Sequence, residues 1–96
     1  MAEKELLELK KTAQFRKDLK RMVKRNLDVD LLDEIILTIR KQEPLDPKYR
    51  DHALTGNYSG FKECHIQSDW LLIYLIDGKN LVLTTSRTGA HSDLFR

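Results

Sequence analysis

The run WLLIYLI, from Trp70 to Ile76, decides how the rest of the chain has to be arranged. Successive side chains of a strand point to opposite faces of its sheet, and here both alternating sets are apolar. Such a strand has to be covered on both faces, so it belongs in the interior of a sheet and not at an edge. The sequence therefore predicts a central strand over residues 70–76.

Two further strands flank this run. Residues 61–67 and 81–86 have strand-forming composition, with Ser68-Asp69 and the turn sequence DGKN (77–80) as the connections. The three runs predict a three-stranded meander. Residues 44–60 before it hold both prolines and the turn sequence TGNYSG, which is typical of a loop. The tail TGAHSDLFR after it is too short to form an element of the core.

The first half of the chain predicts a strand and two helices. Residues 5–11 form the strand, and Thr12 caps a helix that ends near Asn26. Asp30 caps a second helix, which stops before Pro44. The apolar side chains follow helical spacing: Phe15, Leu19, Met22 and Val23 in the first helix, and Leu31, Leu32, Ile35, Ile36 and Ile39 in the second.

The order of elements predicts an α+β fold, β-α-α-β-β-β, in one domain over residues 1–96. A chain of 96 residues holds one core and has no room for two. We expect the two helices to pack on one face of a mainly antiparallel sheet, which leaves the other face free for a ligand.

Composition narrows the class of protein. Hydrophobic residues make up 41% and charged residues 33%, as in folded proteins. No apolar run approaches the ~20 residues that span a bilayer, and the start MAEKELLELKK has no secretory pattern. We expect a cytoplasmic protein without a membrane partner. The single cysteine, Cys64, has no internal disulfide partner and is interpreted as a small core residue, not a nucleophile.

The net charge of +2 hides a concentration of positive charge. Between residues 10 and 25, one acid, Asp18, accompanies eight bases: Lys10, Lys11, Arg16, Lys17, Lys20, Arg21, Lys24 and Arg25. A basic face of this kind binds a polyanion or simply keeps a helix solvated, and charge alone does not decide between the two.

Five polar residues occur where the ends of a meander can converge: His52, His65, Asp69, Arg87 and His91. Each has an ordinary explanation as a surface or hydrogen-bonded residue, but the combination suits metal-free RNA cleavage. A base removes the 2′-hydroxyl proton, an acid protonates the departing 5′-oxygen, and a cation stabilises the phosphoryl charge. Two or three histidines with Asp69 also form a set of metal ligands. We rank that alternative lower and expect no cofactor, because no compact motif such as His-Glu-x-x-His is present.

Two segments resemble a known family. YRDHALTGNYSGFKECHIQSDWLLIY (49–74) and SRTGAHSDLF (86–95) are similar to the YafQ group of the RelE/ParE toxin superfamily, the toxins of bacterial type II toxin–antitoxin pairs. The similarity is densest over residues 49–95, and the helical half matches mainly in pattern and length. Ala53 follows His52 where some relatives have proline, which removes no chemical group.

This resemblance implies a RelE-like fold and an endoribonuclease that cuts mRNA in the ribosomal A site, leaving a 2′,3′-cyclic phosphate and a 5′-hydroxyl. It implies that His91 is the general acid and Arg87 stabilises the phosphoryl charge. Asp69, His65 and His52 serve as the base or orient it and the substrate. Trp70 and Phe95 shape the pocket or stack on a base, although Trp70 fits the core equally well.

The same resemblance implies partners. It implies that a cognate antitoxin binds and inhibits the toxin and that the toxin binds operator DNA only as part of that complex. It also implies that mRNA is the substrate and that four basic residues of the first helix contact ribosomal RNA: Lys17, Lys20, Arg21 and Lys24. Two alternatives stay open. ParE-like relatives share the fold but inhibit DNA gyrase, a role that does not need the histidines. A catalytically inactive regulator would only bind its antitoxin.

Overall fold

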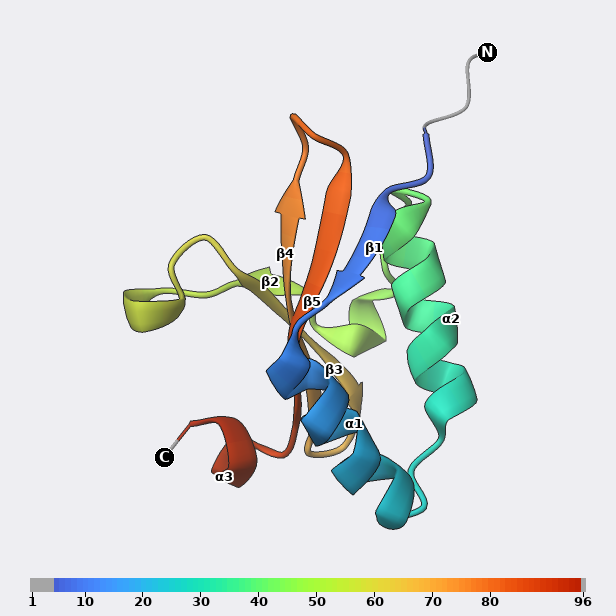
Figure 1. Ribbon diagram of the computed structural model, residues 1–96, viewed down its shortest axis with the longest axis vertical. Coiled ribbons are helices and arrows are strands. Elements are labelled where there is room, and N and C mark those ends of the chain that lie inside the picture. Colours follow the sequence, from blue (N-terminus) through green and yellow to red (C-terminus); the bar gives the residue numbers. More distant parts are fainter. Residues whose placement is uncertain (1–4, 96) are drawn as a thin grey trace.

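The computed structural model describes residues 5–95, so residues 1–4 and 96 of the predicted domain lie outside it. Three helices pack against a mixed five-stranded sheet with the strand order β1-β5-β4-β3-β2 (Figure 1). In chain order the elements are β1 (Glu8–Lys11), α1 (Ala13–Lys24), α2 (Val29–Arg40), the 3₁₀ turn η1 (Pro47–Tyr49), β2 (His52–Ala53), the 3₁₀ turn η2 (Gly56–Tyr58), β3 (Lys62–Gln67), β4 (Trp70–Asp77), β5 (Val82–Gly89) and α3 (His91–Leu94). β1 pairs with β5 in parallel and all other pairs are antiparallel. The predicted α+β fold is confirmed.

β4 is the central strand that the run 70–76 predicts. It lies between β3 and β5, and its side chains are buried on both faces. Leu72 and Tyr74 join the large core under α1 and α2, whereas Leu71 and Ile73 form a second cluster on the opposite face. Leu71, Leu72 and Ile73 have no exposed surface at all. The middle of β4 therefore organises two cores, one on each side of the sheet.

α1 begins where predicted and buries one residue that was not predicted. The Thr12 hydroxyl accepts a hydrogen bond from the Phe15 amide at 2.9 Å, so it caps the helix. Phe15 and Met22 are fully buried, whereas Val23, which follows the same helical spacing, is 52% exposed. The inward position three residues after Phe15 is occupied by Asp18, which has no exposed surface. A charged residue in that position requires a partner in the sheet.

α2 has its predicted stripe but a different cap. The Asp28 carboxylate accepts from the Leu31 amide at 3.2 Å, which places Asp30 inside the first turn, so the prediction of Asp30 as the cap was wrong. The cap lies where the side chain can reach an amide of the first turn that has no partner within the helix. The helix ends at Arg40, before Pro44, as predicted.

Three features near the predicted loop and tail differ from expectation. Residues 44–60 contain β2, whose His52 and Ala53 pair with Glu63 and Lys62. β5 continues to Gly89 instead of ending at residue 86. The tail forms α3, and its Leu94 is 7% exposed against Leu71 and Ile73, so the prediction that the tail adds nothing to the core was wrong.

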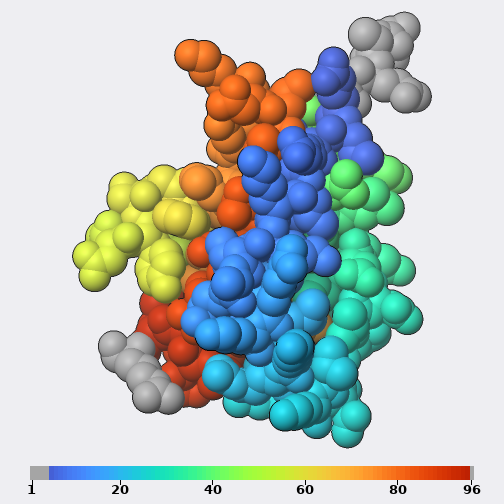
Figure 2. All heavy atoms as spheres, viewed as in Figure 1, coloured from blue at the N-terminus to red at the C-terminus, as the bar shows by residue number. Residues whose placement is uncertain are grey.

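The sheet face opposite α1 and α2 is therefore partly covered, not free. Leu54, Tyr58 and Phe61 also pack on it, because the second cluster of β4 needs apolar neighbours. Figure 2 shows the C-terminal segment, in red, lying beside α1 at one end of the molecule. Within residues 5–95, every helix is too short or too polar to cross a lipid bilayer.

Candidate active site

Three histidines from three elements gather on the face that α3 and residues 54–61 partly cover. The His65 ring lies 6.2 Å from the His52 ring and 6.0 Å from the His91 ring, measured between centroids. β2 brings His52 opposite Glu63 in β3, and His65 follows two residues later on the same face. His91 is the first residue of α3. The structure thus brings together the three histidines that the sequence analysis singled out.

Asp69 holds His91 in place. One carboxylate oxygen accepts from the His91 backbone amide at 3.2 Å and lies 2.9 Å from Nδ1 of the same residue. These bonds to His91 hold the pKa of Asp69 below its usual value. With Nδ1 directed at Asp69, the other ring nitrogen, Nε2, is the one available to a substrate. Both side chains are more than half exposed, so the pair faces solvent.

Glu63 is a site residue that the sequence analysis missed. Its carboxylate is almost fully buried, and Oε1 lies 3.4 Å from His65 Nε2 and 3.6 Å from His52 Nε2. The alternation of β3, which puts Glu63 and His65 on one face, was the available signal. A buried carboxylate attracts positive charge, as protons on the imidazoles or as a cation. The ligand atoms of these three residues lie within 4.8 Å of one another, which fits a divalent metal.

Arg87 is held by Asp18, the second residue that sequence reasoning missed. Arg87 Nε donates to Asp18 Oδ2 at 2.7 Å and a terminal nitrogen donates to Oδ1 at 3.3 Å. The bond to Asp18 raises the pKa of the guanidinium. The Thr88 amide donates to the same carboxylate at 3.2 Å. Arg87 lies inside β5, not at its end as predicted, and the signal for its partner was a single acid among eight bases.

An aromatic wall connects the arginine to the histidines. Tyr58 lies beside Arg87, and its ring is 5.5 Å from that of Phe95. Phe95 is in turn 5.9 Å from the His91 ring and 38% exposed, so its ring is accessible to a base. Arg87, Tyr58, Phe95 and His91 therefore form a continuous surface.

Comparisons with known proteins show the family to which the chain belongs. A family model described as the bacterial toxin of type II toxin–antitoxin systems, YafQ, matches residues 7–96. The chain belongs to the YafQ toxin family. The mRNA interferase toxin YafQ of Escherichia coli is 38% identical over 85 residues, which covers 88% of this chain and 90% of that protein.

Solved structures of similar toxins have the same fold. A metal-bound toxin from Helicobacter pylori superposes with a TM-score of 0.89 at 40% identity, covering 94% of this chain and 100% of that one. The toxin of the E. coli DinJ–YafQ toxin–antitoxin complex superposes with a TM-score of 0.85 at 32% identity, over 95% of this chain and 99% of the other. A copper-bound mutant toxin from H. pylori, 43% identical, has a TM-score of 0.88 with 94% and 100% coverage.

Trp70 belongs to the core of this YafQ-type fold. It is 3% exposed, and its indole nitrogen donates to the Thr88 hydroxyl at 2.8 Å, which donates in turn to the Leu71 carbonyl. It therefore has no free face for stacking on a base, and of the two roles weighed for Trp70 the structure supports the core. Thr88 is the residue after Arg87, so this hydrogen bond links Trp70 to the segment of β5 that carries Arg87.

The basic face of α1 divides into two parts in this family member. Arg25 binds Asp93 of α3 at 2.9 and 3.3 Å, and Arg21 lies 3.8 Å from the same carboxylate. Arg21 therefore faces α3 and does not share the open surface of its neighbours. Lys20 and Lys24, with Leu19 and Val23, border an open groove on the other side of the helix, and Lys17 is exposed.

Cys64 is not a nucleophile in this YafQ-type toxin. It has no exposed surface, and burial raises the pKa of its thiol to about 12. The thiolate is the reactive form, so the interpretation of Cys64 as a core residue is consistent with the structure.

Proposed function

We propose that this YafQ family member is an mRNA interferase, the toxin of a type II toxin–antitoxin pair, and that it cuts mRNA in the ribosomal A site. The observation that carries the proposal is the convergence of His52, His65 and His91, with Asp69 bonded to His91. The E. coli relative is named as an mRNA interferase, and DinJ–YafQ is a toxin–antitoxin complex. A cognate antitoxin and the ribosome are the partners of this toxin, in the cytoplasm.

His91 is the general acid in the proposed reaction. Asp69 holds Nδ1, and Nε2 delivers a proton to the 5′-oxygen as its bond to phosphorus breaks. His65 is the general base, since Glu63 holds its Nε2 and leaves Nδ1 to accept the 2′-hydroxyl proton. A carboxylate behind an imidazole fixes its orientation and stabilises the charge it gains. The 2′-oxygen attacks phosphorus, and the products are a 2′,3′-cyclic phosphate and a 5′-hydroxyl.

Arg87 stabilises the negative charge that builds on the phosphoryl oxygens. Asp18 binds Nε and one terminal nitrogen, and Tyr58 lies beside the guanidinium, so the phosphoryl oxygen would bind at the edge that faces Tyr58. His52 supports His65 through Glu63, and Phe95 stacks on a base. Lys17, Lys20 and Lys24 bind phosphates of ribosomal RNA, contacts that position a protein without reading sequence.

His52, Glu63 and His65 are also the residues that would hold a metal ion. A divalent cation bound there would supply Lewis-acid chemistry, but it would also occupy the nitrogen atoms through which Glu63 supports His65. The steps proposed above use only side chains of this chain. Relatives described as metal-bound and copper-bound make this set of ligands worth testing.

One experiment tests the function against its alternatives. The protein is induced in a bacterial host, new 5′ ends of mRNA are mapped, and His91→Ala serves as the control. We expect in-frame cuts in translated messages that disappear in the variant. DNA damage without cuts would identify a ParE-like gyrase inhibitor. Neither cuts nor growth arrest would identify an inactive regulator.

A further inference from the structure

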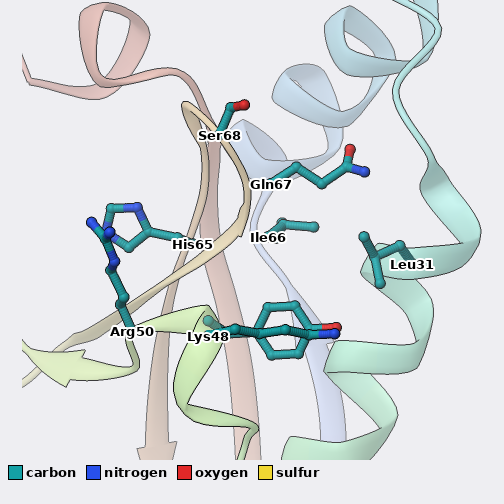
Figure 3. Close-up of a pocket in the computed structure, with 8 residues that line it drawn as sticks. Leu31, Lys48, Arg50, His65, Ile66, Gln67 and Ser68 are labelled. Carbon is teal, nitrogen blue, oxygen red and sulfur yellow. The ribbon is translucent and has the colours of Figure 1, made fainter.

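A hollow of about 440 Å³ leads away from the histidine cluster along the open edge of β3. β2 pairs only with Lys62 and Glu63, so among residues 5–95 no strand pairs with the edge of β3 from His65 onward. In Figure 3, His65 and Arg50 lie at one end of the hollow, and Leu31 of α2 and Gln67 lie toward the other. The volume is within the ~300–1,000 Å³ typical of pockets for small ligands.

The charges around this hollow favour an anion. Lys48 and Arg50 line it, and none of its eight lining residues is acidic. Both cations are exposed, and neither forms an ion pair within residues 5–95. The nearby Glu63 faces His52 and His65. Positive charge is therefore available beside the histidine cluster.

The floor and rim suit a nucleobase. Tyr49, Leu31 and Ile66 provide the apolar surface, and the Tyr49 ring has the Lys48 ammonium 5.2 Å from its centroid. Aromatic rings of this kind stack on bases of single strands. Gln67 and Ser68, both exposed, provide an amide and a hydroxyl at the same opening. These groups donate to and accept from the edge of a base.

Arg50 connects the hollow to the catalytic cluster. Its backbone is in the left-handed region, with φ of 49°, and its carbonyl lies 2.7 Å from His52 Nδ1. This conformation ends the 3₁₀ turn η1, since Arg50 is its C-cap and its amide donates to the Pro47 carbonyl. The backbone of Arg50 thus positions His52 while its side chain lines the hollow.

We propose that this hollow binds the nucleotide next to the phosphate at which the RNA is cut. Arg50 and Lys48 bind the phosphate of that nucleotide, Tyr49 packs against its base, and Gln67 contacts the base edge. The inference rests on the proposed function, since it assigns a neighbouring subsite to the same substrate.

Binding to ribosomes tests the subsite without relying on cleavage. The probes are ribosomes with an empty A site and ribosomes whose A-site message carries 2′-O-methyl groups, which block attack by the 2′-oxygen. We expect the message to tighten binding of the parent, and Lys48→Gln/Arg50→Gln to lose that gain. The slope of log affinity against log salt on the message-filled ribosome becomes shallower by about 0.7, which corresponds to the loss of one single-strand phosphate contact. Lys79→Gln, in the turn after β4, is the matched control and behaves like the parent.

Two results would overturn the subsite. One is equal affinity of the parent for empty and message-filled ribosomes. The other is an equal loss of affinity for both kinds of ribosome in the double variant, because the cations would then contact ribosomal RNA. Gln67→Ala gives a second measurement: we expect it to change the ratio of cuts among messages that differ only in the bases flanking the cut. Failure of the proposed function is recognised separately, as an absence of cleavage in the parent itself.

Discussion

Arg87 in β5 and Asp18 in α1 form an ion pair across 69 residues of chain, with Nε 2.7 Å from the carboxylate. Asp18 has no exposed surface, whereas the Arg87 side chain is 23% exposed. The carboxylate therefore anchors one edge of the guanidinium in the core and directs the other edge toward the site. In the proposed mechanism, this pair gives α1 a role in positioning Arg87.

We expect Asp18→Asn to lower the rate of cleavage at saturating ribosomes, because the guanidinium loses its anchor. It also lowers the free energy of unfolding, by somewhat less than the ~3–5 kcal/mol typical for removing one partner of a buried ion pair, since Arg87 keeps access to water. Denaturant titration and single-turnover cleavage measure the two effects.

Asp28→Asn is the matched control for Asp18→Asn, since asparagine caps helices about as well as aspartate. A variant of Asp18 that unfolds earlier but cleaves at the parent's saturating rate would make the ion pair purely structural. Arg87→Ala should lose both cleavage and stability, because it leaves Asp18 buried without its partner. The sequence alone, which places Arg87 at a strand end, predicts loss of cleavage only.

His91→Ala should reduce cleavage by about 10²–10⁴-fold, the usual contribution of acid–base assistance. The His91 side chain is 56% exposed, so the melting temperature should stay close to that of the parent. Asp69→Asn should have a smaller effect on the rate, since it removes only the support of the imidazole. Single-turnover assays beside thermal melts decide the matter, and a fully active His91→Ala protein would leave the proposed acid without a role.

Acid should destabilise the attachment of α3. Hydrogen bonding by Arg25 holds the pKa of Asp93 below its ordinary value in the folded protein. The stability that the Asp93 carboxylate contributes is therefore fully present above its pKa in the unfolded chain, which is about 3.9. This stability is lost as the pH falls through the lower pKa of the folded protein. Asp93→Asn and Arg25→Gln should each flatten the dependence of unfolding free energy on pH below about 5.

Other carboxylates also titrate in this range, so the comparison of variants isolates Asp93. Lys41→Gln, which changes an exposed cation at the end of α2, is the control and should keep the parent's slope. An unchanged slope in both Asp93→Asn and Arg25→Gln would mean that this contact does not couple protonation to folding.

Divalent metal should inhibit the toxin. Zn²⁺ bound by His52, Glu63 and His65 would occupy the imidazole nitrogen atoms that face Glu63. It would thereby fix the ring of His65, the proposed general base, in the metal site. We expect cleavage to need no divalent ion beyond those that maintain the ribosome, and added Zn²⁺ to slow it. Calorimetry should show weaker Zn²⁺ binding to Glu63→Gln and unchanged binding to Glu34→Gln, an exposed acid on α2. Stimulation of cleavage by Zn²⁺ would contradict the metal-free mechanism.

Lys20→Gln/Lys24→Gln should weaken ribosome binding without changing the saturating rate. These lysines line the open groove of α1 and lie outside the histidine cluster. Each lost phosphate contact lowers the salt slope by about one unit, and stability should change by less than about 0.5 kcal/mol. Pelleting of ribosomes with the protein over a salt series measures the affinity and its salt slope. If the double variant keeps the affinity and the slope of the parent, these lysines only keep the helix face solvated. Arg21 is unsuitable for this test, because it faces Asp93.

The sequence predicted the parts of the fold that local patterns determine. The apolar run of β4, the Thr12 cap and the stop of α2 before Pro44 all depend on neighbouring residues. Asp18 and Glu63 were missed because their burial depends on Arg87, His52 and His65, which the fold brings from elsewhere. The candidate histidines were singled out because they lie near the ends of the predicted meander, and the family resemblance then implied a role for each of them.

The parallel pairing of β1 with β5 has a consequence for how the toxin acquires its site. Glu8 lies opposite Val82, and the Thr12 hydroxyl donates to the Ser86 carbonyl at 2.7 Å. A strand near the start of the described chain therefore pairs with a strand near its end. Contacts between residues so far apart in the chain form slowly, because the entropy of closing the long loop is lost before the contacts contribute any stabilisation. Asp18 and Arg87 are separated by a similar length of chain, so we expect the arginine to be anchored late in folding, after the meander has formed.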